Sequence, residues 1–401
     1  MKVVQINAVY EYSSTGRTTT EMHEYFLEHD IDSYVFCTNM SIPEKNVYKF
    51  SNKFDIFIHA VLSRMFGRQG MYSHFATKRL INRLMQIRPD VVHLRVLHSN
   101  CINLPMLLNY LAEYDIPTVI TLHDCWYFTG HCCYFIDSNC YRWQKKCGNC
   151  PDLKNWNPSY FFDNSEELLA IKKELFSRIK NLAVVGVSDW VTSFIKSSIL
   201  KDAKVVKRIY NWVDFSKFTP RDTNLIRRSI GLGNNDFVVL GVAQHWTSTK
   251  GLDDFIKLAK RCLDVKFVIV GEIYRDDLPG NMIHLGIISD TNRLVDMYAM
   301  ADVFFNPSLR ETFGKVTVES MAAGTPVVAY DATATPEIVT EGCGFIIKSG
   351  DIESACEKIN IIRRNSKSMY SKACIRRAVN NFSKDIIINQ YIQLYGQLKS
   401  Q

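Results

Sequence analysis

The sequence has no long hydrophobic run. No stretch approaches eighteen uninterrupted apolar residues, which excludes an ordinary transmembrane helix. The first residues, Met-Lys-Val-Val-Gln-Ile-Asn, contain no signal-peptide hydrophobic region. Internal repeats and low-complexity tracts are also missing, which sets aside solenoid and disordered architectures. We therefore expect a cytoplasmic protein, or one that is peripheral to the cytoplasmic face of the inner membrane.

The chain also lacks a strong charge of either sign. Its 48 Lys and Arg residues exceed its 41 Asp and Glu residues by only 7. This modest excess does not indicate a nucleic-acid partner, although it favours anionic ligands or an anionic lipid surface. Hydrophobic residues make up 47% of the chain, as in ordinary soluble globular proteins. Its 401 residues exceed the size at which one core keeps growing, so we expect two domains.

Strand-like apolar runs alternate with helix-length segments along most of the chain. This alternation is typical of an α/β protein, in which helices cover parallel sheets. In the first part, strands are predicted at Val3–Ala8, Ser33–Cys37, Val91–Leu94, Thr118–Leu122 and Ala183–Val187. In the second part, they are predicted at Phe237–Ala243, Lys266–Val270, Val303–Phe305, Pro326–Ala329 and Gly344–Ile347. The sequence therefore predicts two Rossmann-like domains.

The boundary between these domains is expected near residues 210–220. There an apolar run gives way to polar residues and to Pro220, which breaks helices. We predict domains at residues 1–208 and 209–380, followed by a helix over 381–401. Four apolar residues of this last segment fall on one helix face: Ile387, Tyr391, Leu394 and Leu398.

Two carboxylates, Glu311 and Glu319, lie eight positions apart around a glycine turn at Gly314. The apolar run 302–306 predicts a buried strand, and the segment 315–323 predicts a helix that starts directly after the glycine. A helix N-terminus favours a phosphate oxygen, because its N–H groups and dipole are positive there. Glu311 can face a bound sugar, while Glu319 can accept hydrogen bonds from ribose hydroxyls. The segment thus suits a nucleotide sugar.

This segment resembles the E-x7-E signature of retaining glycosyltransferases of family 4, including the Ala-Ala-Gly-Thr-Pro-Val-Val-Ala entry to the next strand. The resemblance implies a GT-B fold, in which two Rossmann-like domains face a central cleft and a C-terminal helix crosses back to the first. It implies retention of configuration and no cofactor requirement for catalysis. The implied partners are a nucleotide-diphosphate sugar and a glycan or polyprenyl-pyrophosphate-linked acceptor in surface polysaccharide assembly. It assigns Glu311 to catalysis, and Thr312, Gly314, Lys315 and Glu319 to the donor.

Lys250 and Gly251 follow the first predicted strand of the second domain. A lysine there extends from the carboxyl edge of the sheet, where doubly wound folds bind ligands, and can neutralise a departing diphosphate. The Lys-Gly pair resembles the donor-phosphate motif of the family, so we assign Lys250 to catalysis. The family's additional arginine is absent, because Gln244 and Thr249 occupy the candidate positions, and a weaker phosphate grip is expected.

Two further segments of the first domain carry candidate residues. The stretch 12–21 links the first strand to a helix, where its hydroxyl residues can cap the helix and Gly16 and Arg17 can approach a phosphate or acceptor. It resembles the G-S-T-G-R turn of colanic-acid-type polysaccharide glycosyltransferases. His123 ends a predicted strand at the carboxyl edge and can hydrogen-bond the transferred sugar. It resembles the cleft histidine of the family, which implies a catalytic role.

Residues 129–151 form a cysteine-rich insertion. Cys147 and Cys150 have the C-x2-C spacing of a zinc site, and Cys140 with Cys132 or Cys133 would complete four ligands. We predict a structural zinc on Cys132, Cys140, Cys147 and Cys150; the alternative is a set of reduced or disulfide-linked cysteines. The insertion looks like a pattern of the colanic-acid-type subgroup, which implies that it shapes the acceptor pocket.

Residues 50–90 interleave basic and aromatic side chains, which can form a membrane-facing helix or a core with a solvated face. The basic members are Lys53, Arg64, Arg68, Lys78, Arg79, Arg83 and Arg88, and the aromatic members are Phe54, Phe57, Phe66, Tyr72 and Phe75.

Two other functions stay open from the sequence. One is a nucleotide-sugar epimerase on a similar scaffold, which would need no acceptor. The other is a zinc-stabilised binding protein for nucleotide sugar, glycan or nucleic acid.

Overall fold

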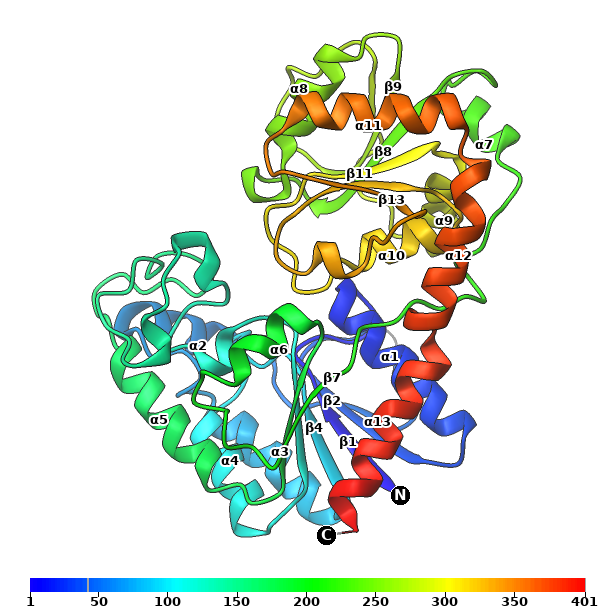
Figure 1. Ribbon diagram of the computed structural model, residues 1–401. Helices are drawn as coiled ribbons and strands as arrows, with labels where there is room; N and C mark the ends of the chain where they lie inside the picture. The colour runs from blue at the N-terminus through cyan, green and yellow to red at the C-terminus, as the bar shows by residue number, and fades with distance from the viewer. Residues whose placement is uncertain (42, 401) are drawn as a thin grey trace. The chain divides into compact units, whose positions relative to one another are not determined.

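The computed structural model describes residues 1–41 and 43–400 and divides into two compact units (Figure 1). Unit 1 comprises Met1–Ile209 and Ile388–Gln401, and unit 2 comprises Tyr210–Ile387. Each unit has its own parallel sheet covered by helices. The prediction of two Rossmann-like sheets is confirmed.

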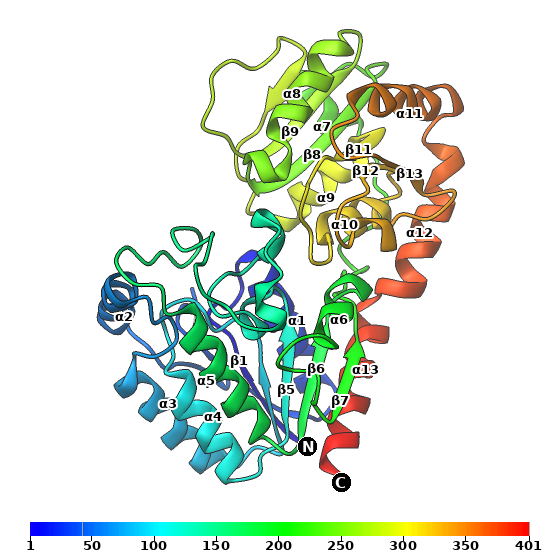
Figure 2. The same ribbon diagram turned by 60° about the vertical axis from the view of Figure 1, so that its left-hand side comes forward.

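The sheet of unit 1 has seven parallel strands in the order β3-β2-β1-β4-β5-β6-β7. These strands are β1 (Lys2–Ile6), β2 (Asp32–Cys37), β3 (Val47–Lys49), β4 (Val91–Leu94), β5 (Thr118–Leu122), β6 (Leu182–Gly186) and β7 (Val205–Arg208). Its helices are α1 (Ser13–Glu28), α2 (Lys53–Phe66), α3 (His74–Ile87), α4 (Leu104–Glu113), α5 (Ser165–Ser177) and α6 (Asp189–Ile195). Figure 2 shows α3, α4 and α5 together along one side of this sheet.

The sheet of unit 2 has six strands in the order β10-β9-β8-β11-β12-β13. They are β8 (Val238–His245), β9 (Lys266–Glu272), β10 (Met282–His284), β11 (Val303–Asn306), β12 (Val327–Tyr330) and β13 (Gly344–Ile347). The helices are α7 (Asn224–Ser229), α8 (Leu252–Arg261), α9 (Thr291–Met300), α10 (Lys315–Ala322), α11 (Ile352–Asn365) and α12 (Ser368–Phe382). The strand order reverses at β8, whose neighbours are β9 and β11, so the carboxyl ends of β8 and β11 define the ligand-binding edge of this fold.

Ten strands coincide with the predicted runs, and three were not predicted. The central strands read as continuous apolar runs because helices bury both faces of a parallel sheet. The three missed strands, β3, β7 and β10, all lie at sheet edges. They are short, and every residue of β7 is only half-buried. Apolar runs therefore predict the centre of each sheet better than its edges.

The last helix, α13 (Lys384–Lys399), returns to unit 1, as predicted. The hydroxyl of Tyr391 contacts Oγ1 of Thr121 at 3.0 Å, and the hydroxyl of Tyr395 contacts Nδ1 of His93 at 2.7 Å. The four apolar residues predicted to share one face, Ile387, Tyr391, Leu394 and Leu398, are each 1% exposed. Across the described residues, no helix combines the length and the apolar content needed to span a bilayer.

Candidate active site

Two loops at the ligand-binding edge of unit 2 are joined tightly. One follows β8 and the other follows β11, and the amide of Leu309 donates to the carbonyl of Thr249 across them at 2.9 Å. Gly251 has φ +76°, and a Cβ added there would lie 2.3 Å from the carbonyl oxygen of Pro307. Only glycine permits this approach, which explains the residue that follows Lys250.

The two residues that the sequence assigned to catalysis in this unit are in direct contact. Nζ of Lys250 donates to Oε1 of Glu311 at 2.5 Å. The backbone of Glu311 is fixed as well, because its amide donates to Oγ1 of Thr333 at 2.8 Å and its carbonyl accepts from the same hydroxyl at 2.7 Å. The side chains of Lys250 and Glu311 are 33% and 14% exposed, so both are accessible to solvent while the backbone of Glu311 is fixed.

The predicted glycine turn and helix are present. Gly314 has φ +87° and directly precedes α10. Oγ1 of Thr317, in the first turn of α10, accepts from Nδ2 of Asn306 at 3.0 Å, which ties the helix start to the end of β11. Thr312 is half-buried beside this turn and Lys315 is buried. The N-terminus of α10 is therefore held at the same sheet edge as Lys250, in a position suited to an anion.

Glu319 lies deeper than a ribose-binding residue was expected to lie. It is 0% exposed, and its Oε2 accepts from the hydroxyl of Tyr298 on α9 at 2.9 Å. The carboxylate thus helps to join α9 to α10. Its contact with ribose stays a prediction, and it requires the carboxylate to become accessible when the donor binds. The contact of Tyr298 with Glu319 was not predicted, because the two residues lie 21 positions apart and no sequence pattern links them.

In unit 1, His123 follows β5 and contacts Arg95, which follows β4. Nη2 of Arg95 lies 3.3 Å from Nε2 of His123 and 2.6 Å from Oγ1 of Thr18. Arginine has only donors, so Nε2 of His123 accepts and the proton of the neutral ring is on Nδ1. The contact of His123 with the transferred sugar stays a prediction. Arg95 was missed, although a charged residue directly after a buried strand signals the carboxyl edge of a sheet.

The segment around Gly16 and Arg17 forms the beginning of α1 instead of a loop. The helix starts at Ser13, and its N-cap residue Tyr12 makes no side-chain cap. The next residue, Ser13, supplies the expected hydroxyl contact, because its Oγ accepts from the amide of Gly16 at 3.4 Å. Further along the helix, Oγ1 of Thr19 donates to the carbonyl of Thr15 at 2.8 Å, as hydroxyls inside helices do. Gly16 is buried and Arg17 is half-buried. Their contact with a phosphate or acceptor stays a prediction.

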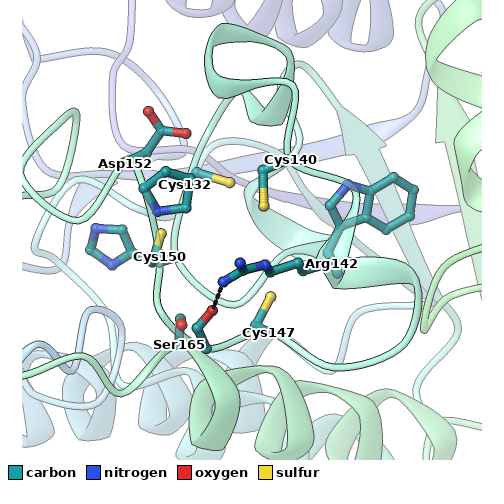
Figure 3. A pocket seen from close by; sticks show the side chains of 11 residues that line it. Cys132, Cys140, Arg142, Cys147, Cys150, Asp152 and Ser165 are labelled. Atoms are coloured by element: carbon teal, nitrogen blue, oxygen red, sulfur yellow. Dashed lines mark hydrogen bonds between the residues drawn. The ribbon is translucent and has the colours of Figure 1, made fainter.

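The predicted four-sulfur zinc site is not supported. Cys132, Cys140, Cys147 and Cys150 line one pocket (Figure 3), yet among the described residues no three of their sulfurs lie within 4.8 Å of one another. Arg142 lines the same pocket, and its Nη1 donates to the carbonyls of Gly148 and Asn149 at 2.7 and 3.0 Å. The positive charge of the Arg142 guanidinium would repel a divalent metal ion in this pocket.

Three thiols of this pocket, those of Cys132, Cys147 and Cys150, are shifted toward the protonated form, and none of the four is paired in a disulfide. Burial raises the pKa of Cys132 and Cys147, and raises that of Cys150 to about 12. All twelve cysteines are free, so the disulfide alternative is not found either. The insertion is instead packed through its aromatic side chains: the ring of Trp143 lies 4.8 Å from that of Phe128 and 5.1 Å from that of Phe135.

Two family models match this chain. The family model described as Glycosyltransferase Family 4 matches residues 15–217, and the one described as Glycosyl transferases group 1 matches residues 222–379. The chain is 22% identical over 371 residues to the putative colanic acid biosynthesis glycosyl transferase WcaC of Escherichia coli K12, over 88% of both chains. It is 25% identical over 232 residues to the capsular polysaccharide biosynthesis glycosyltransferase CapM of Staphylococcus aureus, over 53% of this chain and 61% of that one.

A solved structure shares the fold. The crystal structure of Anabaena HepE in complex with UDP-glucose matches all of this chain and all of its own with a TM-score of 0.66 and 17% identity. Because the two family models together cover most of the sequence, the assignment does not depend on one motif. The chain belongs to glycosyltransferase family 4, the retaining enzymes of GT-B fold that use nucleotide-sugar donors.

Proposed function

We propose that the protein transfers a sugar with retention from a UDP-sugar to a hydroxyl of a glycan or polyprenyl-pyrophosphate-linked glycan, as a colanic-acid-type enzyme of bacterial surface polysaccharide assembly. The contact between Lys250 and Glu311 at the ligand-binding edge of unit 2 carries this proposal. The names of WcaC and CapM support the pathway class, and the UDP-glucose complex of HepE supports the nucleotide.

The geometry suits departure of a diphosphate. Negative charge develops on the leaving group, and preorganised cations and amide dipoles stabilise such charge most effectively. Lys250 supplies the cation, and the N-terminus of α10 supplies the amide dipoles. The turns at Gly251 and Gly314 hold both in place. In the proposed mechanism, the ammonium of Lys250 turns from Glu311 toward the diphosphate when the donor binds. Glu311 then orients the sugar.

Product analysis tests this function. Purified protein would be incubated with UDP-, GDP- and CMP-sugars, with and without a polyprenyl-pyrophosphate-linked glycan acceptor. We expect UDP release that depends on the acceptor, and a product whose anomeric configuration matches that of the donor by NMR. Isomerised donor without acceptor would indicate the epimerase alternative. Binding without turnover of any donor would indicate the binding-protein alternative.

A second part of the proposal concerns the membrane. On α2, two aromatic side chains are turned outward: Phe54 is 68% exposed and Phe57 is 64% exposed. At the end of α2, the ring of Phe66 stacks on that of Phe162 at 6.2 Å, and Phe161 beside it is 72% exposed. Exposed aromatic rings among basic residues suit the interface of an anionic membrane. We propose that this face binds the membrane that carries the acceptor.

Vesicle sedimentation tests the membrane face. The double variant Phe57→Ser, Phe161→Ser should lose binding to vesicles that contain phosphatidylglycerol. Leu225→Ser removes a side chain of unit 2 that is 82% exposed and should bind like the wild type. Equal binding by the double variant would contradict the proposal.

A further inference from the structure

A second group of metal-binding side chains lies outside the donor site and outside the cysteine-rich pocket. A ring nitrogen of His98, a carboxylate oxygen of Asp124 and Sγ of Cys133 all lie within 4.8 Å of one another. Nε2 of His98 is 2.8 Å from Oδ2 of Asp124. Asp124 and Cys133 are 7% and 1% exposed, and the side chain of His98 is 21% exposed, so the group is buried but reachable from one side.

We propose that His98, Asp124 and Cys133 bind one Zn²⁺ ion. Imidazole, carboxylate and thiolate are the three side-chain types that coordinate zinc in proteins. Zinc bonds of about 2.0–2.3 Å hold ligand atoms about 3.5 Å apart, so the group needs only small side-chain adjustments. Three protein ligands leave one position for water.

The ligands are held by contacts of the kind found around metal sites. Oδ1 of Asp124, the oxygen that does not face His98, accepts from the amide of Trp126 at 2.8 Å. Nδ2 of Asn157 approaches Sγ of Cys133 at 3.6 Å and can donate to a thiolate there. Such outer contacts orient metal ligands and tune their affinity.

The position of the group gives the ion a role. His98 lies in the loop after β4, and Asp124 lies in the loop after β5. Cys133 belongs to the cysteine-rich insertion. A bound ion would tie the insertion to the carboxyl edge of the sheet, next to His123. The nearby ammonium of Lys172 donates to the carbonyls of Trp126 and Thr129 at 2.7 and 3.0 Å, which fixes the main chain that follows Asp124.

Metal content tests the site without an activity assay. The full-length protein would be loaded with Zn²⁺, freed of excess metal and measured by atomic emission. We expect about one equivalent in the wild type, and a loss of at least tenfold in affinity for Cys133→Ala and for His98→Ala. Cys125→Ala is the matched control, because this neighbouring buried cysteine is not part of the group. It should bind like the wild type.

Cobalt separates this site from the cysteine-rich pocket. Co²⁺-loaded wild type should show a thiolate-to-cobalt absorption band that Cys133→Ala lacks and Cys147→Ala keeps. Asp124→Asn retains the acceptor for Trp126, so it should fold, keep the band and bind more weakly. Circular dichroism confirms the fold of each variant. Absence of bound metal in the wild type would overturn the proposal, and so would loss of the band in Cys147→Ala with retention in Cys133→Ala.

Discussion

The carboxyl edges of the two sheets are built in different ways. In unit 2, backbone geometry positions the site: Gly251 and Gly314 adopt positive φ, and neighbouring loops are joined by main-chain hydrogen bonds. In unit 1, side chains from segments far apart in the sequence position the site residues, as in the contacts of Arg95 with Thr18 and His123. A site held by backbone turns concentrates its residues in short motifs. A site held by side-chain networks disperses them along the chain.

The largest expected effect is on the chemistry of unit 2. Lys250→Ala removes the cation proposed to stabilise the leaving diphosphate and should lower kcat/KM by about 10²–10³-fold, as loss of one transition-state donor does. Stability should change little, because a partly exposed ion pair contributes about 0–1 kcal/mol. Steady-state kinetics and urea unfolding measure the two effects. Lys257→Ala, on the exposed face of α8, is the control. Unchanged kcat/KM in Lys250→Ala would refute the assignment.

The next effect tests whether backbone geometry holds that site. Gly251→Ala places a Cβ 2.3 Å from the carbonyl oxygen of Pro307 at a positive φ, so both loops must shift. We expect a loss of about 1–3 kcal/mol in the free energy of unfolding and a fall in activity. Gly231→Ala is the matched control, since Gly231 also has a positive φ, +80°, but nothing lies within 4 Å of its added Cβ. Equal unfolding curves for both variants would show that the close approach does not hold the site.

The same contrast explains what the sequence predicted. Glu311, Gly314 and the start of α10 were predicted together because they are adjacent in the chain and obey simple rules of helix starts. Thr333, which fixes the backbone of Glu311, was missed, because it joins the site from 22 positions away. The nine central strands were predicted for a similar reason, since burial on both faces gives continuous apolar runs.

The sequence predictions were wrong or incomplete where several segments converge. Cysteine spacing indicated zinc, but spacing does not fix where the sulfurs point, and Arg142 lines the pocket among them. Glu319 is buried and hydrogen-bonded to Tyr298, a contact that the sequence did not indicate. Each outcome depends on tertiary contacts that a local pattern does not contain.

In unit 1, removing one hydroxyl tests the side-chain network. Tyr395→Phe leaves Nδ1 of the buried His93 without its partner at 2.7 Å. An unsatisfied buried polar atom costs about 1–3 kcal/mol, so α13 and unit 1 should become less stable by that amount. Thermal unfolding of the variant would be compared with that of Tyr114→Phe, whose residue is 57% exposed. A change no larger than that of Tyr114→Phe would show that the network does not hold α13.

The smallest effect is a pH dependence confined to unit 1. Nε2 of His59 accepts from the amide of Gly70 at 3.2 Å, so its Nδ1–H donates to Oγ of Ser73 at 2.7 Å and the ring is neutral. Burial lowers the pKa of His59 to about 4. Below about pH 6.5 the unfolded chain binds a proton that the folded chain does not, so stability falls as the pH falls from 6.5 toward 4.

This contribution has to be measured as a difference. Burial also lowers the pKa of His23, another buried histidine of unit 1, which adds an effect of the same sign. The free energy of unfolding should therefore be compared between the wild type and His59→Gln at each pH. Gln retains polarity but does not titrate, so the difference between the two proteins should change between pH 6.5 and 5 by at most about 1.4 kcal/mol per pH unit. A constant difference over this range would show that His59 binds its proton equally well in the folded and unfolded chains.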